Sequence, residues 1–427
     1  MPQTIAVVGA GLVGLTTAYW LRRNGAEVRV IDAAPGPGLG TSFANGGMLT
    51  PSQANPWNAP GVWRNAVGAI GRADSPLMVR PAALPGLVGW GTRFVLESRP
   101  ERYRANARRS FALGRYSLEQ HRAILADTGI DCSRAAVGTV QIFHDEASLA
   151  AARAIAEMLA PDGLAFRVLD PDALFQLEPA LRHSTHRPYA GIHFPDDESG
   201  DAHLFCQNLA EHLQQGGVEF LYDTPVERIE AEGGRLRALH GPRGRVGADG
   251  FVIAAASRSR ALLRPFGIRL PIYPVRGYSL TCDIAAVPDV PRLPLVDMHR
   301  KVAVTPLGPW LRLAGTAEFG HPQADRDPDA AMDERRLALV RRDAREILPA
   351  LREMPDEAMQ PWTGLRPVTP TGFPIMGRRL DNLYLNTGHG PLGWTFAAGS
   401  GRIVADIVLR RTHDLAHLPH LQQEIVA

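Results

Sequence analysis

Three glycines near the amino terminus have the residue type and spacing of a nucleotide-binding turn. Gly9, Gly11 and Gly14 follow the apolar run 4–8, and apolar residues then recur at helical spacing until Gly25. The first glycine allows a tight turn, the second lets the backbone approach a pyrophosphate, and the third lets helix and strand pack closely. Free N–H groups at the start of this helix would attract negative charge. The motif therefore predicts a phosphate-binding turn.

An isolated acid completes this motif. The run 27–31 predicts a second parallel strand, and Asp32 stands at its carboxyl end. A carboxylate at that place can accept hydrogen bonds from a ribose diol. Strand, helix, strand and acid in this order predict a dinucleotide site, which the glycines alone would indicate only weakly.

A second glycine-rich turn lies near the other end of the chain. The short strand 383–386 leads into the turn 387–395, and a helix is predicted from about Thr395 to Leu409. Such a turn at a helix N-terminus makes another site for negative charge. FAD would use both turns, one at the pyrophosphate and one at the N1/C2=O edge of the isoalloxazine, whereas NAD has no evident need for the second.

The elements between these turns predict an interleaved α/β fold. Helices are expected over 101–128, 146–159 and 203–215, and strands over 138–143, 218–222, 226–230 and 250–256, the last three completing the first sheet. Alternating residues between about 270 and 313 predict an antiparallel sheet. We expect a discontinuous cofactor-binding domain over 1–60, 195–270 and 362–427, with a second domain over 61–194 and 271–361.

Composition narrows the class of protein. The chain has 427 residues, 45% of them hydrophobic and 21% charged, with a formal charge of +2 and no basic tract, so nucleic acid is not an expected partner. Three scattered cysteines predict neither a disulfide framework nor a metal site, and they fit a reducing compartment. No signal peptide is expected, because the first strand begins within a few residues. We expect a cytoplasmic protein.

The stretch 82–96 is the most apolar in the chain. It is rich in Leu and Val but is broken by Pro85, by glycines and by Arg93, so it is too short to span a membrane. We expect an ordinary buried helix here. The alternative is an interfacial patch in peripheral contact with the inner face of the cytoplasmic membrane.

Several independent motifs, in the same order, resemble the D-amino acid oxidase superfamily of flavoproteins, and within it the bacterial D-amino acid dehydrogenases of the small-subunit type. The motifs are the opening glycines, 41–47, 55–61, 195–201, 273–280, 362–367 and 387–395. The resemblance covers essentially the whole chain. It implies a Rossmann-type domain that binds FAD non-covalently, interleaved with a substrate-binding domain whose large mixed or antiparallel sheet lies over the flavin. It also implies that a D-amino acid is oxidised to the imino acid, which water hydrolyses to a 2-oxo acid and ammonia.

The resemblance also implies the substrate-binding groups. Arg366 stands in the family's Gly-x-Arg-Pro motif, and its planar fork suits a carboxylate. Tyr278 lies on the strand expected over the flavin, where its hydroxyl could donate to the same carboxylate or simply be buried. His389, in the second turn, could touch flavin or substrate, although hydrogen bonding within the turn is more common. Lys301, the one lysine of the chain, lies either near the flavin or substrate or in solvent.

The residues expected to bind FAD come from both turns and from the segments between them. They are Gly9, Gly11, Leu12, Val13, Gly14, Asp32, Ala33, Ser42, Asn45, Gly46, Gly47, Met48, Val226, Ala254, Ala255, Gly364, Gly388, His389, Gly390, Leu392, Gly393, Trp394 and Thr395.

The electron acceptor and the substrate stay open at this point. The relatives pass electrons to a membrane quinone or another carrier, whereas an oxidase of the same fold would reduce oxygen. The substrate could instead be D-proline, cis-4-hydroxy-D-proline, glycine or sarcosine. A Rossmann-type binding protein without redox turnover is the alternative from another class.

Overall fold

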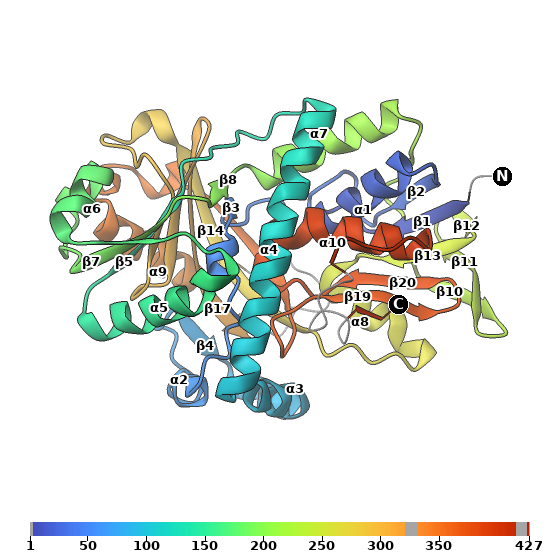
Figure 1. The fold of residues 1–427 in the computed structure, drawn as a ribbon, viewed down its shortest axis with the longest axis horizontal. Helices are drawn as coiled ribbons and strands as arrows, with labels where there is room; N and C mark the ends of the chain where they lie inside the picture. The colour runs from blue at the N-terminus through green and yellow to red at the C-terminus, as the bar shows by residue number, and fades with distance from the viewer. Residues whose placement is uncertain (1–2, 321–331, 416–424, 427) are drawn as a thin grey trace.

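The chain forms two lobes, each built on its own β-sheet (Figure 1), in a computed structural model that describes residues 3–320, 332–415 and 425–426. The parts of the expected domains at 1–2, 321–331, 416–424 and 427 lie outside the described residues. The long helix α4 (Pro100–Thr128) runs across the face of the molecule between the lobes (Figure 1). This architecture confirms the α/β class predicted from the sequence.

The first lobe contains a seven-stranded sheet with a parallel centre. Its order is β21-β19-β20-β13-β1-β2-β9, and β19 and β21, which are parallel to each other, run antiparallel to the other five strands. The strands are β1 (Thr4–Val8), β2 (Glu27–Ile31), β9 (Glu219–Leu221), β13 (Gly250–Ile253), β19 (Ile375–Leu380), β20 (Leu383–Thr387) and β21 (Ile425–Val426). Segments far apart in the sequence thus build one sheet, as the interleaved pattern predicted.

Both faces of this sheet are buried, because side chains along a strand alternate. On β1, Ile5 and Val7 pack with residues of α1 (Leu12–Arg23), α7 (Ala202–Gln215) and α10 (Gly393–Val408). Ala6 and Val8 point the other way and pack against a small three-stranded sheet. The near-continuous apolar run of this strand follows from burial on both sides.

The small sheet differs from the prediction. It is antiparallel and consists of β10 (Arg228–Glu232), β11 (Arg235–Gly241) and β12 (Gly244–Gly247), so the run 226–230 does not extend the seven-stranded sheet. Gly233 and Gly234 both have positive φ, +58° and +77°, which is the geometry of a two-residue hairpin. That turn sends the chain straight back on itself.

The second lobe contains a nine-stranded mixed sheet. Its order is β18-β14-β17-β16-β15-β5-β7-β6, with β4 beside β17. The strands are β4 (Leu77–Val79), β5 (Thr139–Phe143), β6 (Arg167–Leu169), β7 (Ala190–Phe194), β14 (Tyr273–Asp283), β15 (Leu295–Asp297), β16 (Val302–Leu307), β17 (Trp310–Phe319) and β18 (Gln360–Val368). A two-stranded ladder joins β3 (Met48–Leu49) to β8 (Glu198–Ser199). Strand β18 pairs with β14 along its length, so the expected boundary at 362 cuts a strand of the large sheet.

One face of the large sheet packs on helix α9 (Glu334–Ile347). Val302, Leu311 and Leu313 of the sheet share a core with Leu337 and Val340 of the helix. Helices α5 (Glu146–Leu159) and α6 (Pro171–Leu177) lie at the far end of this lobe (Figure 1). The other face of β14, β17 and β18 is left for a ligand.

Helices α2 (Val62–Gly68) and α3 (Leu84–Glu97) protrude at the lower edge of the molecule (Figure 1). The sequence predicted an ordinary buried helix over 82–96, and this prediction is wrong, since no residue of α3 is buried. No helix in the described part of the chain is both long enough and apolar enough to cross a bilayer. Helix α8 (Ser259–Leu263) lies in the first lobe.

A buried polar cluster ties the sheet to its surroundings. The Tyr278 hydroxyl donates to Oε2 of the fully buried Glu318 at 2.7 Å, and Arg80 forms an ion pair with the same carboxylate. Arg80 also pairs with Asp333, which caps α9, at 3.1 Å. Burial, reinforced by the neighbouring Glu318, raises the pKa of Tyr278. The cluster therefore joins β14, β17, the segment after β4, and α9.

We predict that Tyr278→Phe lowers the free energy of unfolding by about 1–3 kcal/mol, because the buried Glu318 carboxylate loses a donor. Urea unfolding followed by circular dichroism measures the change. Tyr189→Phe is the matched control, since Tyr189 is 48% exposed. Equal midpoints for the Tyr278→Phe protein and the wild type would contradict the role given to this hydrogen bond.

Candidate functional site

A cavity of about 2080 Å³ extends from the carboxyl ends of β1 and β2 to the free face of the large sheet. It exceeds the roughly 300–1,000 Å³ of ordinary small-ligand pockets. The first glycine turn, the loop 38–48, the second glycine turn and β18 all line it. The space is thus continuous from the nucleotide motif to Arg366.

The opening glycines adopt the geometry that their spacing predicted. Gly9 has φ +118°, and a Cβ on it would lie 2.6 Å from the Ala254 carbonyl oxygen. A Cβ on Gly14 would overlap the Gly9 carbonyl, so this glycine serves the close packing of helix on strand. Gly11 is the N-cap of α1 and supplies no side-chain cap, and the first turn of α1 holds no acid. The positive end of the helix therefore opens into the cavity.

Asp32 holds the turn from the end of β2. Its Oδ2 accepts the Ala10 N–H at 2.5 Å, and its Oδ1 accepts the Ala34 N–H at 2.8 Å. An ionised carboxylate has about four acceptor sites, so two remain for a ribose diol. Val226 and Ala255, both expected to bind FAD, line the same cavity as Asp32.

The second glycine turn reaches the same cavity from the other direction. Gly390 has φ +56°, and α10 begins at Gly393 without a side-chain cap and without an acid in its first turn. Helix α10 packs directly on α1: the Thr16 hydroxyl donates to the Ala397 carbonyl at 2.8 Å, and Gly401 faces Thr16 (Figure 1). Two helix N-termini whose own N-cap residues supply no side-chain cap therefore open side by side into one space, with the Ser42 hydroxyl accepting the Leu12 N–H of α1 at 3.2 Å. This arrangement fits FAD, which carries negative charge at two separate places.

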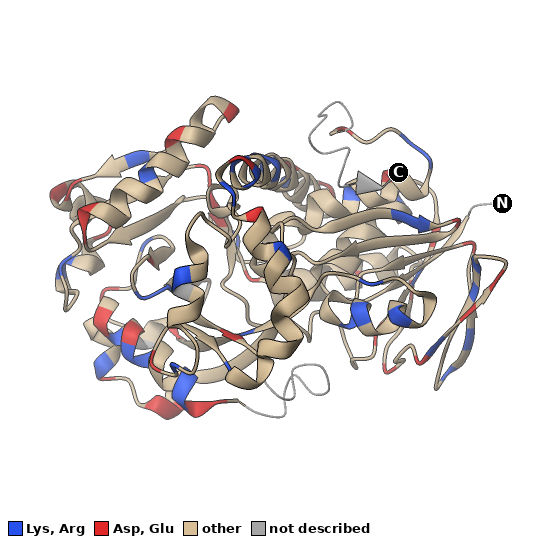
Figure 2. Cartoon of the chain, turned by 90° about the horizontal axis from the view of Figure 1, so that it is seen from below, with Lys and Arg blue, Asp and Glu red and all other residues tan. Residues whose placement is uncertain are grey.

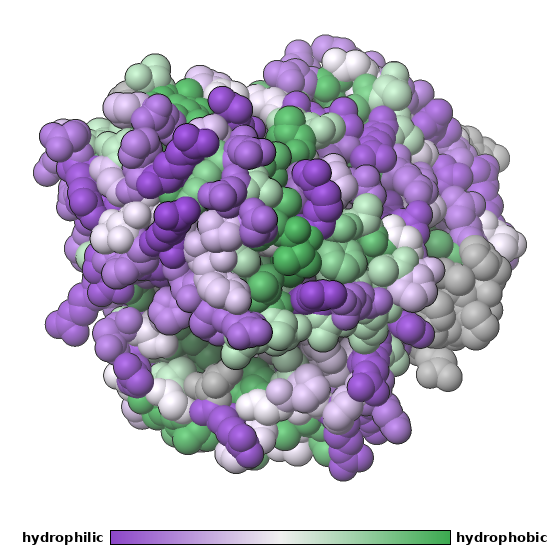
Figure 3. Space-filling model, turned by 60° about the vertical axis from the view of Figure 1, so that its left-hand side comes forward, coloured by the Kyte–Doolittle hydropathy of each residue, from purple (hydrophilic) through white to green (hydrophobic). Residues whose placement is uncertain are grey.

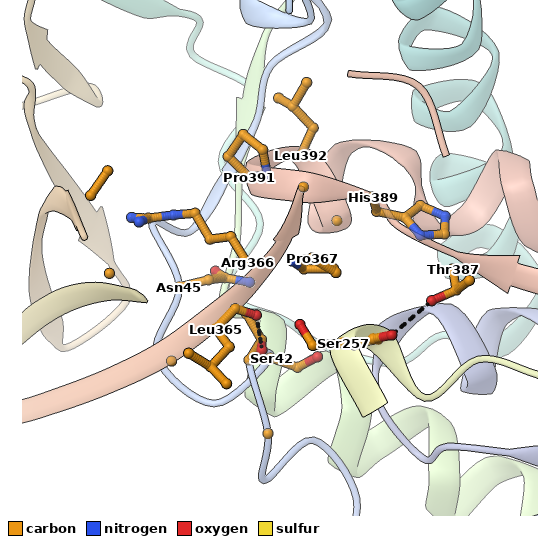
Figure 4. Close-up of a pocket in the computed structure, with 18 of the residues that line it drawn as sticks. Ser42, Asn45, Ser257, Leu365, Arg366, Pro367, Thr387, His389, Pro391 and Leu392 are labelled. Carbon is orange, nitrogen blue, oxygen red and sulfur yellow. Dashed lines mark hydrogen bonds between the residues drawn. The ribbon is translucent and has the colours of Figure 1, made fainter. Parts of the chain in front are cut away.

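His389 lies inside the second turn and is held there. Its Nε2 lies 2.9 Å from the Ser400 hydroxyl on α10, and burial lowers its pKa to about 3. In Figure 4 its ring points away from the Arg366 side chain. A neutral imidazole fixed in this way shapes the turn, which matches the structural alternative stated for it.

Three sheet side chains pin the loop that passes over the cavity. Ser279 of β14 donates to the Ala44 carbonyl at 2.7 Å, and Thr305 of β16 donates to the Gly46 carbonyl at 2.8 Å. Arg312 of β17 donates to the carbonyl of Asn45 between them, also at 2.8 Å. Sequence reasoning missed these groups, although each is a polar residue in an otherwise buried strand.

Arg366 stands on the free face of the large sheet with its positive charge uncompensated. Its Nη1 donates to the Thr316 carbonyl at 2.9 Å, and the guanidinium lies 5.9 Å from the centre of the Trp57 ring. Within the part of the chain that the structure describes, no carboxylate pairs with it. Burial lowers its pKa to about 10, so it stays charged at neutral pH. A charge kept in such a place calls for an anionic ligand.

A bulge between β14 and β17 makes room for this guanidinium. The register shifts between Arg276 and Tyr278, and Thr316, opposite the shift, has φ +60°, an unusual value for a β-branched residue. A Cβ on Gly277 would overlap the Arg366 guanidinium. Gly277 was not among the predicted site residues, although a glycine inside a buried strand is a known sign of close approach.

Tyr278 does not bring its hydroxyl to Arg366. Gly277 and Ser279, its neighbours, face the cavity and the loop, so the Tyr278 ring faces the opposite side and bonds Glu318. Tyr278 still borders the cavity, although its hydroxyl is bonded to Glu318. The structure thus gives the hydroxyl the buried role that was its alternative.

Nearly all residues predicted to bind FAD line the cavity, and Figure 4 shows several of them around Arg366. The two exceptions are Gly14 and Gly388. Gly14 allows α1 to pack closely on β1, and Gly388, with a φ of +81°, lies against Thr369 within the second glycine turn.

Comparison with known proteins places this geometry in a family. The model of the FAD dependent oxidoreductase family matches residues 4–407. A D-amino acid dehydrogenase of Rhodopseudomonas palustris is 41% identical over 403 residues, covering 94% of this chain and 93% of the relative. One of Vibrio cholerae is 37% identical over 415 residues and covers 97% of both.

Solved structures agree in fold. Glycine oxidase from Bacillus cereus superposes with a TM-score of 0.73 at 20% identity, over 100% of this chain and 98% of that one. L-proline dehydrogenase from P. horikoshii gives a TM-score of 0.70 at 18% identity, over 98% and 96%. With its two helix N-termini opening into one cavity, this chain belongs to the family of FAD-dependent oxidoreductases.

Proposed function

We propose that this protein is a D-amino acid dehydrogenase that passes its electrons to a quinone at a membrane surface. The observation that carries the proposal is the uncompensated Arg366 guanidinium in the cavity that also receives both helix N-termini. A carboxylate-bearing substrate would neutralise that charge. The names of the similar proteins supply the stereochemical class.

Each group of the cavity has a task in this reaction. Arg366 holds the substrate carboxylate in a fork, and Gly277 leaves the space in which the fork lies. The α1 N-terminus and Asp32 would hold the pyrophosphate and ribose of FAD, and the α10 N-terminus would stabilise negative charge at the other part of the cofactor. When bound, FAD would supply the two-electron acceptor for a hydride.

The reaction needs alignment more than a strong base. The α-carbon loses a hydride while the amine lone pair forms the C=N bond, and the amine then loses a proton. Water adds to the imino acid and releases ammonia and the 2-oxo acid. His389 is buried and neutral, so the chain's own part is to fix the carboxylate, to favour the neutral amine and to keep the α-hydrogen facing the flavin.

An exposed apolar surface adjoins the mouth of this cavity. We call it the apolar platform, and it comprises Trp63, Val67, Ile70, Leu84, Val88 and Val95 on and beside α2 and α3. All of these except Val88 also line the cavity. Green surface appears at this lower end of the molecule in Figure 3, and the helices facing the viewer in Figure 2 are mostly tan.

The charge around the platform suits an anionic bilayer. Between residues 51 and 96 the chain has four arginines and one acid, Asp74. Arg80 pairs with Glu318 and Arg72 with Asp74, so Arg64 on α2 and Arg93 on α3 carry the positive charge beside the platform. At 14 residues α3 spans about 21 Å at roughly 1.5 Å per residue, too short to cross the hydrocarbon core of about 30 Å. A helix of this kind lies in the interface. From there an apolar quinone could enter beside the flavin without crossing water.

Anaerobic mixing of the holoenzyme with D- and L-amino acids tests the reaction. We expect D-amino acids to bleach the flavin absorbance near 450 nm and their L-enantiomers to leave it unchanged. Glycine, sarcosine, D-proline and cis-4-hydroxy-D-proline belong in the same panel. Bleaching by L-amino acids alone, or by none of these compounds, would refute the proposal. If oxygen reoxidised the flavin faster than a soluble quinone did, the protein would be classed as an oxidase.

Replacing the planar guanidinium of Arg366 by the ammonium of a lysine should weaken substrate binding. For Arg366→Lys we expect KM for the best D-amino acid to rise about 30-fold or more, since one good charge-assisted contact is worth roughly 2 kcal/mol. Flavin content should not change, because Arg366 lies at the sheet end of the cavity. Steady-state kinetics and the ratio of absorbance at 450 and 280 nm measure both. An unaltered KM would remove Arg366 from the site.

A charge on the platform should weaken membrane binding. Val88 is 67% exposed and does not line the cavity, so Val88→Glu should leave turnover with a soluble dye intact. Binding to vesicles of equal phosphatidylglycerol and phosphatidylcholine should fall about tenfold, for a loss of roughly 1.4 kcal/mol. Val168→Glu, at a position 40% exposed on β6, is the matched control. Equal co-sedimentation of both variants would exclude the platform as the membrane contact.

A further inference from the structure

One row of side chains crosses the face of the large sheet that lines the cavity. Strand pairing places Ser279 of β14 opposite Ala314 of β17, and Ala314 opposite Ala303 of β16. Ala303 stands opposite Val296 of β15, and Val296 stands opposite Gln141 of β5. Directly opposed residues point to the same face of a sheet, and all five residues line the cavity. We call Ala314, Ala303, Val296 and Gln141 the cavity row.

The cavity row has small apolar residues at its start and an amide at its end. Ala314 and Ala303 are directly opposed, so their methyl groups lie about 5 Å apart and leave room for a ligand above the sheet. Gln141 is 7% exposed and lines the cavity, and among the described residues its amide forms no hydrogen bond. Nearly all buried amides have a partner, so the Gln141 amide is available to a ligand.

The Arg366 guanidinium lies near the start of the cavity row. A Cβ on Gly277 would overlap the guanidinium, so the guanidinium stands over Gly277. Ser279 is the next residue of β14 on that face, one step of about 6.7 Å along the strand. Four spacings of about 4.8 Å separate β14 from β5 across the sheet. The distance from Gly277 to Gln141 is therefore about 20 Å.

A substrate held by Arg366 reaches the Gln141 amide only if its side chain is long. A paired guanidinium and carboxylate take up about 4 Å of this distance, a hydrogen bond about 3 Å and the glutamine side chain about 4–5 Å. About 8–9 Å remain between the carboxylate carbon and the end of the substrate side chain. An extended tyrosine has about this length, whereas alanine has about a third of it.

We propose that the cavity row is the subsite for the substrate side chain, and that Gln141 binds a neutral hydrogen-bonding group at the end of a long side chain, such as the phenol of D-tyrosine. This inference rests on the proposed function. An amide both donates and accepts hydrogen bonds, so it suits a hydroxyl group. The residues of the cavity row carry no charge, so a charged side chain would lose water there without gaining an opposite charge.

Two carboxylic acids without an amine test this subsite without turnover. 3-(4-Hydroxyphenyl)propionate and 3-phenylpropionate differ only in the hydroxyl group, and their dissociation constants with the FAD-loaded protein are read from the perturbation of the flavin spectrum. We expect the hydroxylated acid to bind at least fivefold more tightly to the wild type, and less than twofold more tightly to Gln141→Leu. Equal affinities in the wild type, or the same ratio in both proteins, would overturn the proposal.

Gln360→Leu is the matched control for Gln141→Leu. Gln360 is an exposed residue of β18 in the same sheet, and it does not line the cavity. We expect this variant to bind both acids as the wild type does. If Gln360→Leu lowered the ratio as much as Gln141→Leu, the effect would come from the sheet as a whole and the proposal would fail.

Kinetics of Ala303→Leu supply the second readout, because a larger residue in the cavity row should act according to the length of the substrate. We expect kcat/KM for D-tyrosine to fall at least 20-fold and that for D-alanine to change less than threefold, since D-alanine ends short of Ala303. Equal losses for the two substrates would overturn the proposal. So would a preference of the wild type for D-glutamate over D-tyrosine.

The two experiments separate this inference from the proposed function. If no D-amino acid reduced the flavin of the wild type, the proposed function would fail. The two carboxylic acids would still report whether Gln141 binds the end of a long ligand.

Discussion

The close packing of α1 on α10 is the contact on which the site depends. The two helices come from opposite ends of the chain, and each begins at a glycine-rich turn whose N-cap residue supplies no side-chain cap. Gly401 allows the approach, since a Cβ there would lie 2.8 Å from the Thr16 hydroxyl oxygen. A wider separation would point the two positive helix ends at different ligands. Their contact makes them one site for one extended molecule with negative charge at two places.

The large sheet carries the second half of the site and uses its two faces for different purposes. On one face Tyr278, Leu280 and Cys282 of β14 pack with α9, and Tyr278 and Arg80 bond the buried Glu318. On the other face small and polar residues hold the loop 44–46 and leave space for Arg366. Both roles lie on the same strands. The packed core that stabilises the lobe therefore also restricts the position of the Arg366 guanidinium.

The sequence predicted the local features and missed those that depend on register. The glycine turns, Asp32 and the helix of α4 follow from short-range patterns, and the structure has them where the patterns place them. The orientation of Tyr278 depends on which face of β14 packs on α9, and the alternation of side chains along a strand does not say which face that is. The bulge adds its extra residue to β17, where it reverses the alternation near Thr316. The exposure of α3 was missed because an apolar composition indicates that a helix tends to be buried, but it does not show whether the chain itself or a partner buries it.

The distribution of charge along the cavity explains why few ionisable groups are needed to orient the substrate for oxidation. Asp32 and Glu227 lie at the nucleotide end, where hydroxyls and amides need acceptors, while Arg366 lies at the sheet end. His389 is neutral, because burial lowers its pKa to about 3. We expect an amino acid that binds here to place its carboxylate toward Arg366. This fixed charge orients the substrate, and the departure of a hydride from the neutral amine form needs no side chain that accepts a proton at the same moment.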